Sequence, residues 1–127
     1  MHTILITNDD GIHSPGLMAL KKSLAPLGKI VIVAPDRDNS AISHALTMNR
    51  PLRLTTLDED VYTLDGTPTD CVHLAVTLLT DGRLPDLVVS GINHGPNLGN
   101  DVHYSGTVAA AREGALRGVP SIALSNS

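Results

Sequence analysis

Three hydrophobic runs along the chain each end in a cluster of polar residues. The runs are Ile4–Ile6, Lys29–Val33 and Leu87–Val89. They are rich in valine and isoleucine, which is typical of strands that are buried on both faces. The polar clusters therefore follow the carboxyl ends of the predicted strands.

A helical repeat separates the first two runs. Apolar residues return there at spacings of three and four, as expected for one face of an amphipathic helix. These residues are Leu17, Leu20, Leu24 and Leu27. We expect Ser14 to cap this helix, Pro15 to occupy its first turn, and Pro26 with Gly28 to end it. The chain up to Val33 thus predicts a right-handed unit of strand, helix and parallel strand.

The middle of the chain predicts a segment outside the alternation of strands and helices, which we call the excursion, and then a second helix. Leu52–Leu57 and Val61–Leu64 alternate between apolar and polar residues, which favours a β-hairpin or an irregular segment. Thr67 is the predicted cap of a helix over Cys71–Leu79, with Asp70 near the positive end of its dipole.

The end of the chain predicts one more helix and strand. Ser105-Gly106-Thr107 is the expected start of a helix that runs to Arg117, and Pro120–Leu124 is the expected strand. The order is β-α-β, an excursion, then α-β-α-β, so the fold class is α/β with a doubly wound, mostly parallel sheet. Because no linker or repeat interrupts it, residues 1–127 are expected to form a single domain.

Composition argues against some classes of function and favours others. The 127 residues are 42% hydrophobic and 17% charged, with a net charge of -4 and one cysteine. The net negative charge and the lack of a basic run argue against binding to a nucleic acid duplex. No apolar run is long enough to span a membrane and no leader is visible, so a cytoplasmic protein without disulfides is expected.

The candidate chemistry begins at Asp9 and Asp10, directly after the first strand. Two adjacent carboxylates repel each other, and a divalent cation removes that cost. The alternative is that one carboxylate caps the following helix while the other is solvated. Ser40 and Asn93 are neutral oxygen donors near the ends of the neighbouring strands, and Mg²⁺ or Mn²⁺ accepts such ligands. The topology therefore predicts a metal site formed by Asp9, Asp10, Ser40 and Asn93.

Two further segments suit a phosphate group. Residues 90–100 are rich in glycine and asparagine, and Ser105-Gly106-Thr107 at a helix start would offer free amides and two hydroxyl groups. The alternatives are an ordinary surface loop and an ordinary helix cap.

The histidines and the cysteine give weaker signals. The six histidines lack zinc-type spacing, so a structural zinc is not expected. His73 is expected to pack within its helix, whereas His44, His94 and His103 are expected in loops. Cys71 has no base paired with it in sequence and is interpreted as a small core residue.

Four ordered motifs carry a family resemblance. They are Ile6–Gly16, Val33–Arg37, Gly66–Val72, and Val89–Asn93 continued by Tyr104–Ala110. Together they resemble the SurE family, the stationary-phase survival protein nucleotidases, over essentially the whole chain. The resemblance implies a Rossmann-like, three-layer α/β/α core with a mostly parallel sheet.

The resemblance also implies a function. It implies a divalent-metal-dependent phosphatase, using Mg²⁺ or Mn²⁺, that releases phosphate from nucleoside 5′- or 3′-monophosphates. By this resemblance, the metal ligands of the family correspond to Asp9, Asp10, Ser40 and Asn93. The family's phosphate-facing residues correspond to Asn97, Ser105, Gly106 and Thr107. Members run to about twice this length, and their second half supplies elements for homodimer and tetramer formation. We therefore expect this chain to be truncated before those elements.

Two catalytic mechanisms and one non-catalytic role remain open. The first is direct attack of a metal-activated water, with Asp9 or Asp10 orienting or deprotonating it. The second is an aspartyl-phosphate route through Asp9, which usually needs an acid where Gly11 stands. The third is a non-catalytic module that binds metal and nucleotide without turnover.

Overall fold

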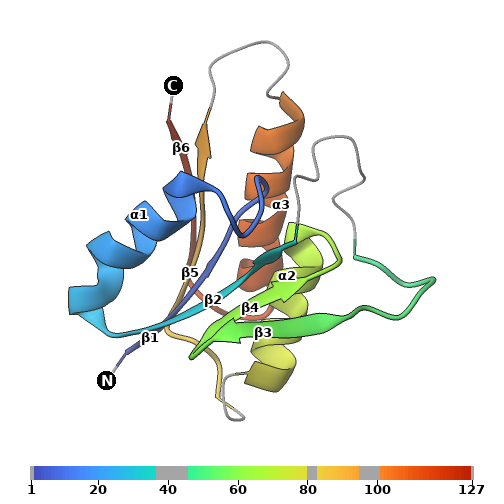
Figure 1. Ribbon diagram of the computed structural model, residues 1–127, viewed down its shortest axis with the longest axis horizontal. Coiled ribbons are helices and arrows are strands. Elements are labelled where there is room, and N and C mark those ends of the chain that lie inside the picture. The colour runs from blue at the N-terminus through green and yellow to red at the C-terminus, as the bar shows by residue number, and fades with distance from the viewer. Residues whose placement is uncertain (1, 37–45, 80–82, 95–100, 127) are drawn as a thin grey trace.

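The computed structural model describes residues 2–36, 46–79, 83–94 and 101–126. Its strands are β1 (Thr3–Thr7), β2 (Lys29–Pro35), β3 (Leu54–Asp58), β4 (Val61–Leu64), β5 (Leu87–His94) and β6 (Ser121–Asn126). They form one sheet in the order β3-β4-β2-β1-β5-β6 (Figure 1). Only the β3–β4 pair is antiparallel among these described strands. The α/β class and the mostly parallel sheet are confirmed.

Helices cover both faces of this sheet. The helices are α1 (Pro15–Leu24), α2 (Pro68–Leu74) and α3 (Asp101–Leu116), and short 3₁₀ and π turns follow α1 and α2 at Ala25–Leu27 and Ala75–Leu79. Helix α1 packs on β1 and β5 from one side, while α2 and α3 lie side by side on the other (Figure 1). The fold therefore has the three expected layers. No helix in the described part of the chain is long and apolar enough to cross a membrane.

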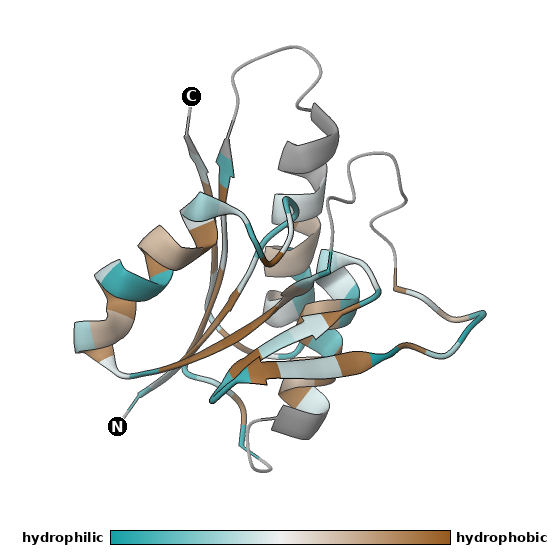
Figure 2. Cartoon of the chain, viewed as in Figure 1, coloured by the Kyte–Doolittle hydropathy of each residue, from teal (hydrophilic) through white to brown (hydrophobic). Residues whose placement is uncertain are grey.

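The two-sided burial of the central strands explains their hydrophobic runs. In β1, Ile4 and Ile6 pack in the cluster that contains Leu17 and Leu20 of α1. Leu5 between them packs in the opposite cluster, with residues of α2 and α3. Figure 2 shows this hydrophobic character along the central strands. Alternate side chains of one strand thus build both halves of the core.

The first helix departs from the prediction at its two ends. Leu17 and Leu20 are buried as predicted, but Leu27 is 59% exposed because the 3₁₀ turn moves it off the helix face. Ser14 occupies the N-cap position, yet within this described segment its side chain makes no capping hydrogen bond. The prediction was therefore right about the helix and about Ser14 at its N-cap position, and wrong about the burial of Leu27.

The excursion is a β-hairpin, as the alternation favoured. β3 pairs with β4 in antiparallel register, and β4 pairs in parallel with β2. The hairpin therefore extends the sheet beyond β2 by two strands.

The third hydrophobic run is longer than predicted. β5 continues through Asn93 to His94, because the parallel neighbour β6 pairs with it on both sides of an irregularity between Ser90 and Asn93. Asn93 and His94 thus lie in a strand and not in a loop. The predicted strand at Pro120–Leu124 is confirmed as β6.

His73 is not packed in the core, contrary to the prediction. It is half-buried on α2, and its Nδ1 lies 3.5 Å from Oε2 of Glu113 on α3. The same carboxylate accepts a hydrogen bond of 2.8 Å from Nε of Arg117. His73 therefore takes part in a polar contact between the two helices, at the border of the core.

Gly91 allows β5 and β6 to approach closely, which generates a prediction about stability. Its φ is +147°, and a Cβ at this position would lie 2.6 Å from the carbonyl oxygen of Leu124. We expect Gly91→Ala to lower the free energy of unfolding by about 1–3 kcal/mol, measured by urea denaturation.

Gly118→Ala is the matched control. Gly118 has a φ of +85°, but none of the described atoms lies within 4 Å of a Cβ built there. Only backbone strain remains, so a loss of about 1 kcal/mol is expected. Equal losses in the two variants would contradict the importance of the β5–β6 contact.

Candidate metal and phosphate site

A tight turn after β1, formed by Asn8–Gly11, positions the two aspartates. We call it the diacid turn. Nδ2 of Asn8 donates a hydrogen bond of 2.8 Å to the carbonyl oxygen of Gly11, and the Gly11 amide donates one of 3.1 Å to Oδ1 of Asn8. The Ile12 amide then donates to the carbonyl oxygen of Pro35 at 2.8 Å. The turn is therefore closed on itself and tied to the end of β2.

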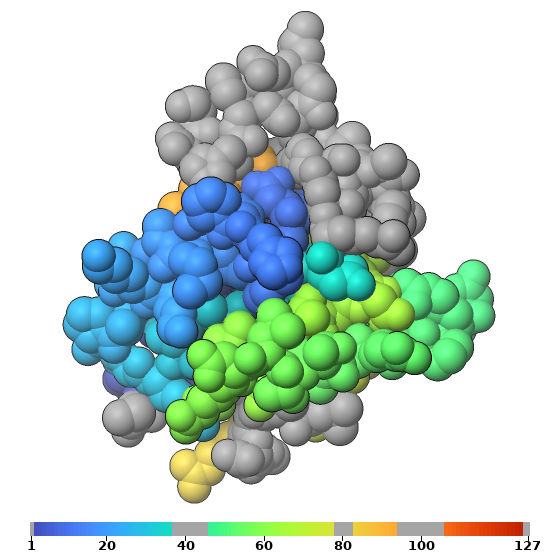
Figure 3. All heavy atoms as spheres, viewed as in Figure 1, coloured from blue at the N-terminus to red at the C-terminus, as the bar shows by residue number. Residues whose placement is uncertain are grey.

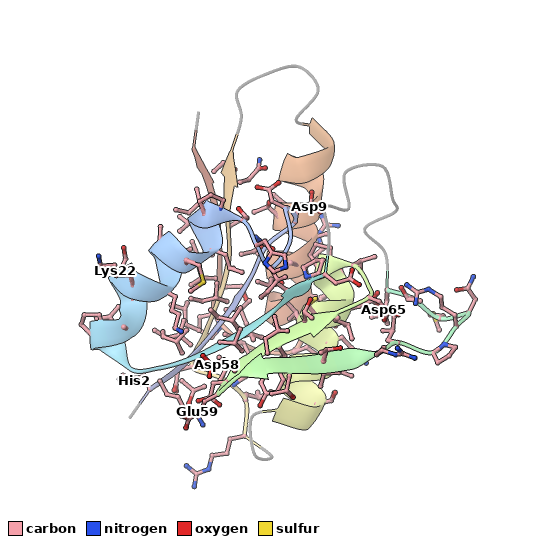
Figure 4. The ribbon with its side chains drawn as sticks, viewed as in Figure 1. His2, Asp9, Lys22, Asp58, Glu59 and Asp65 are labelled. Atoms are coloured by element: carbon pink, nitrogen blue, oxygen red, sulfur yellow. The ribbon has the colours of Figure 1, made fainter. Side chains whose placement is uncertain are left out.

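The carboxylate of Asp9 lies inside the protein. Asp9 is only 1% exposed, whereas the next residue, Asp10, is half-buried. Figure 4 shows Asp9 at the end of the sheet opposite to His2, Asp58 and Glu59. Because burial of an ionised carboxylate is costly, such a group normally has a compensating positive charge or several hydrogen bonds.

Neutral oxygen donors lie on the neighbouring strand. β1 and β5 pair in parallel, with Thr7 opposite Ser90, so Asn93 is on the strand next to the diacid turn. Asn93 is 4% exposed. Its Oδ1 and the Oγ of Ser90 are buried and have no hydrogen-bond partner among the described residues. A buried acceptor of this kind calls for a ligand or an ordered water.

These donors fit a hard divalent cation. Carboxylate and amide oxygens are the ligands that Mg²⁺ and Mn²⁺ prefer, and Asp9 and Asn93 supply one of each, both buried, at the same edge of the sheet. The described residues contain no group of three or more His, Cys, Asp or Glu side chains that could hold a metal ion. The donors at this edge of the sheet are two acids with neutral oxygens.

The structure brings together only some of the predicted site residues. Asp9, Asp10 and Asn93 lie at the same edge of the sheet, at β1 and β5. Ser40 and Asn97, like His44, are outside the described residues. Gly106 and Thr107 are buried in α3, while of Ser105 only the backbone is described.

The predicted helix start at Ser105 is wrong. α3 begins at Asp101, so Ser105-Gly106-Thr107 lies in its second turn. Amides in a second turn bond to carbonyl groups one turn earlier, and they are therefore not the free donors that the prediction required. Small and hydroxyl residues resemble a cap in sequence, but here the helix continues on their amino-terminal side. The same extension places the backbone of His103 in α3 and not in a loop.

Asp70 caps α2 and also binds Thr47, and the second of these contacts was not predicted from sequence. Its carboxylate accepts hydrogen bonds from the Thr67 amide (2.9 Å), the Thr47 amide (2.6 Å) and the Thr47 hydroxyl (2.5 Å). The Asp70 amide in turn donates to Oγ1 of Thr67 at 3.0 Å, which completes a capping box. The Thr-Pro-Thr-Asp sequence signals the box. Nothing local signals the bonds to Thr47, which is 23 residues away.

Cys71 is a core residue, in agreement with its interpretation from sequence. Its side chain is fully buried, and burial raises the pKa of the thiol far above its ordinary value of 9.0. The negative charges of Asp70 and Asp36 act in the same direction. A thiol that stays protonated is a poor nucleophile, so Cys71 is not suited to covalent catalysis.

The fold and the site together define a doubly wound α/β protein with an acidic, oxygen-donor site at the carboxyl edge of its sheet. A sequence model of the family described as "Survival protein SurE" matches residues 4–127. The chain therefore belongs to the SurE family.

Individual relatives agree with this assignment. The chain is 58% identical over 125 residues to the 5′-nucleotidase SurE of Pelobacter propionicus, and 54% identical over 126 residues to that of Aquifex aeolicus. Each alignment covers 98% of this chain and 50% of the relative. The crystal structure of the SurE protein from Aquifex aeolicus matches with a TM-score of 0.89 at 54% identity, over 97% of this chain and 50% of that one. The chain spans about half the length of the curated relatives it matches.

The buried thiol gives a reactivity prediction. At pH 8, Cys71 should react with a thiol reagent at least about a hundredfold more slowly in the native chain than in urea, because only opened molecules expose an ionisable thiol. The raised pKa also means that this group stabilises the fold below pH 9.0 and that its contribution is lost as the pH rises further. Rapid labelling of the native chain would contradict the burial of Cys71.

The double role of Asp70 gives a prediction about stability and local exchange. Asp70→Ala leaves three donors without their acceptor and should lower the free energy of unfolding by about 2–4 kcal/mol in urea denaturation. Thr67→Val is the control, because it removes the acceptor for the Asp70 amide but keeps the Asp70 carboxylate, and it should cost about 1 kcal/mol.

Amide hydrogen exchange separates the two variants further. The Thr47 amide should exchange faster in Asp70→Ala and be unchanged in Thr67→Val, since only Asp70 accepts from it. An unchanged Thr47 amide in Asp70→Ala would show that this bond does not hold the segment.

Proposed function

We propose that this chain is the catalytic core of a divalent-metal-dependent phosphatase that hydrolyses nucleoside 5′-monophosphates, and also 3′-monophosphates, to nucleoside and phosphate. The observation that carries the proposal is the buried Asp9 carboxylate beside Asp10, with the buried amide oxygen of Asn93 at the same edge of the sheet. The relatives from Pelobacter propionicus and Aquifex aeolicus, both named 5′-nucleotidase, support it.

The proposed metal ligands are Asp9, Asp10, Ser40 and Asn93, and the metal is Mg²⁺ or Mn²⁺. When bound, such an ion polarises a phosphoryl oxygen and lowers the pKa of a coordinated water. The protein contributes a rigid turn, closed by Asn8 and Gly11, that holds the two carboxylates in place. In this proposal Asp9 or Asp10 orients the attacking water and accepts its proton, the phosphorus–oxygen bond to the nucleoside breaks, and the leaving alkoxide takes up a proton from solvent.

The proposed phosphate-binding residues are Asn97, Ser105, Gly106 and Thr107. The helix start that first suggested this segment lies earlier, at Asp101, so contact through free amides of residues 105–107 is not part of the proposal. The hydroxyl groups of Ser105 and Thr107 and the side chain of Asn97 remain the proposed donors to the phosphate oxygens. Gly106 has no side-chain donor, and its proposed role is to leave room for the phosphate between the two hydroxyl residues.

Two wider properties belong to the same proposal. The whole protein is proposed to act as a homodimer or tetramer, on the basis of the resemblance to its family. It is proposed to work in the cytoplasm, which fits a single, buried cysteine.

Two readouts test the function. Phosphate release from a panel of nucleoside monophosphates should need Mg²⁺ or Mn²⁺, stop in chelator, and fall at least about a hundredfold in Asp9→Asn, because a ligand and water-orienting group is lost. Mn²⁺ at a hundred times its dissociation constant should also stabilise the unsubstituted chain by about 2.7 kcal/mol. Asp9→Asn should lose this stabilisation.

Asp58→Asn is the matched control. Asp58 is an exposed aspartate at the opposite end of the sheet, so both readouts should stay unchanged (Figure 4). Stabilisation by Mn²⁺ without phosphate release would instead favour the non-catalytic metal- and nucleotide-binding module. Label from ¹⁸O-water that enters Asp9 in a single turnover would favour an aspartyl-phosphate intermediate.

A further inference from the structure

Ser90 is a buried hydroxyl residue to which the proposed site gives no role. It lies in β5, three residues before Asn93, and its side chain is fully buried. Its Oγ has no hydrogen-bond partner among the described residues, and the same is true of Oδ1 of Asn93. Burial of a hydroxyl group without a partner costs free energy, so the presence of Ser90 in the core requires an explanation.

An irregularity in β5 places these two side chains on one face of the sheet. Ser90 pairs with Ala123 of β6 and Asn93 pairs with Ser125, so three steps along β5 match two steps along β6. Alternate residues of a strand share a face, so Ala123 and Ser125 do, and their partners Ser90 and Asn93 do as well. Without the extra residue in β5, Asn93 would lie on the opposite face.

The shared face is the one that α2 and α3 cover. Val88, two residues before Ser90, packs in the cluster that contains Cys71 of α2. Ile92, which lies between Ser90 and Asn93, packs against the other cluster, together with residues of α1. Figure 3 shows α1 and the diacid turn on the face toward the viewer, so Ser90 and Asn93 belong to the far face.

Small residues of α3 lie above this part of β5. A Cβ at Gly114 would be 3.0 Å from Cγ2 of Val88. α3 joins the parallel strands β5 and β6, so it runs back along β5, and Ala110 lies about 6 Å nearer the carboxyl end of the strand. Ser90 is about 6–7 Å beyond Val88 in the same direction. The residue of α3 above Ser90 is therefore a small one, Ala110.

One water molecule has the right size to join Ser90 with Asn93. Side chains that share a face of a strand are about 6–7 Å apart at their Cα atoms, and two successive hydrogen bonds through a water span about 5.6 Å. A buried water needs at least two polar partners, which the Ser90 hydroxyl and the Asn93 amide oxygen provide. The hydroxyl group of Thr7, which pairs with Ser90 in β1, can provide a third.

We propose that Ser90 is a positioning residue of the metal site, and that its hydroxyl group, through one bridging water, holds the Asn93 amide with its oxygen toward the metal ion. The inference rests on the proposed function, in which Asn93 is a metal ligand. The oxygen and the NH₂ group of an asparagine amide occupy nearly equivalent positions, and only the oxygen binds a cation. A hydrogen bond donated to the second lone pair of that oxygen favours the orientation that binds the ion.

The first test measures metal affinity and stability in the same variant. Ser90→Ala should weaken Mn²⁺ binding about tenfold in calorimetry, because the Asn93 amide then lacks the donor that orients it. Its urea midpoint without metal should not fall, because the Ser90 side chain makes no hydrogen bond to the described residues. A residue with only a structural role would show the reverse pattern.

Ser121→Ala is the matched control. It is the same change in the neighbouring strand β6, but Oγ of Ser121 donates a hydrogen bond of 2.9 Å to the carbonyl oxygen of Val119. Loss of this bond should lower the urea midpoint and leave the Mn²⁺ affinity within about twofold, because Ser121 pairs with Val88, away from the carboxyl edge. A lower urea midpoint in Ser90→Ala with an unchanged Mn²⁺ affinity would overturn the inference.

The Asn93→Asp background separates amide orientation from every other effect of Ser90. Either oxygen of a carboxylate binds the ion, so a carboxylate needs no donor to orient it. Ser90→Ala should therefore change the Mn²⁺ affinity by less than about twofold in Asn93→Asp, compared with about tenfold in the unsubstituted chain. Equal losses in the two backgrounds would contradict the orienting role.

Metal binding also separates this inference from the proposed function. If Mn²⁺ binds with this pattern but no nucleotide is hydrolysed, the catalytic proposal fails and the role of Ser90 is supported. If phosphate is released and Ser90→Ala binds Mn²⁺ as tightly as the unsubstituted chain does, the role of Ser90 is overturned and the nucleotidase is supported.

Discussion

The parallel pairing of β1 with both β2 and β5 is the constraint on which the rest of the structure depends. Parallel strands end at the same edge, so the chain that follows each of the three strands must emerge there. The polar segments after β1 and β2 and the carboxyl end of β5 are distant in sequence, yet they meet because their strands are neighbours. One edge of the sheet thereby collects the acids and the neutral oxygens.

Hydrogen bonds hold the backbone that carries the buried acids of the protein. The turn after β1 is closed by Asn8 and attached to β2 through Ile12, so the backbone that carries Asp9 is held in place. Asp70 has a comparable role at α2, where its carboxylate accepts hydrogen bonds from the Thr67 amide at the helix start and from the Thr47 amide. Such closed polar networks fix the positions of side chains more tightly than apolar packing alone does. A site that must place several oxygens around one point requires this kind of support.

The two faces of the sheet are covered differently. On the α1 side, Thr55 of β3 and Thr63 of β4 share a face with Ala34 and line a pocket. On the other side, α2 and α3 pack together and bury Cys71, Thr107 and the hydrophobic residues of the core. The diacid turn stands between these regions.

The sequence by itself determined the features that depend on near neighbours. Hydrophobic runs predicted β1, β2 and the beginning of β5, and the Thr67–Asp70 pattern predicted the start of α2, because strand burial and helix capping leave local signals. The diacid at the end of β1 was also evident from sequence, and so was its edge of the sheet. Only the tertiary structure decided that β5 continues to His94, that α3 begins at Asp101, and that Asp70 holds Thr47. The extension of β5 depends on β6 and the bond to Thr47 depends on a residue 23 positions away, and the pairing of distant segments leaves no periodic signal in either one.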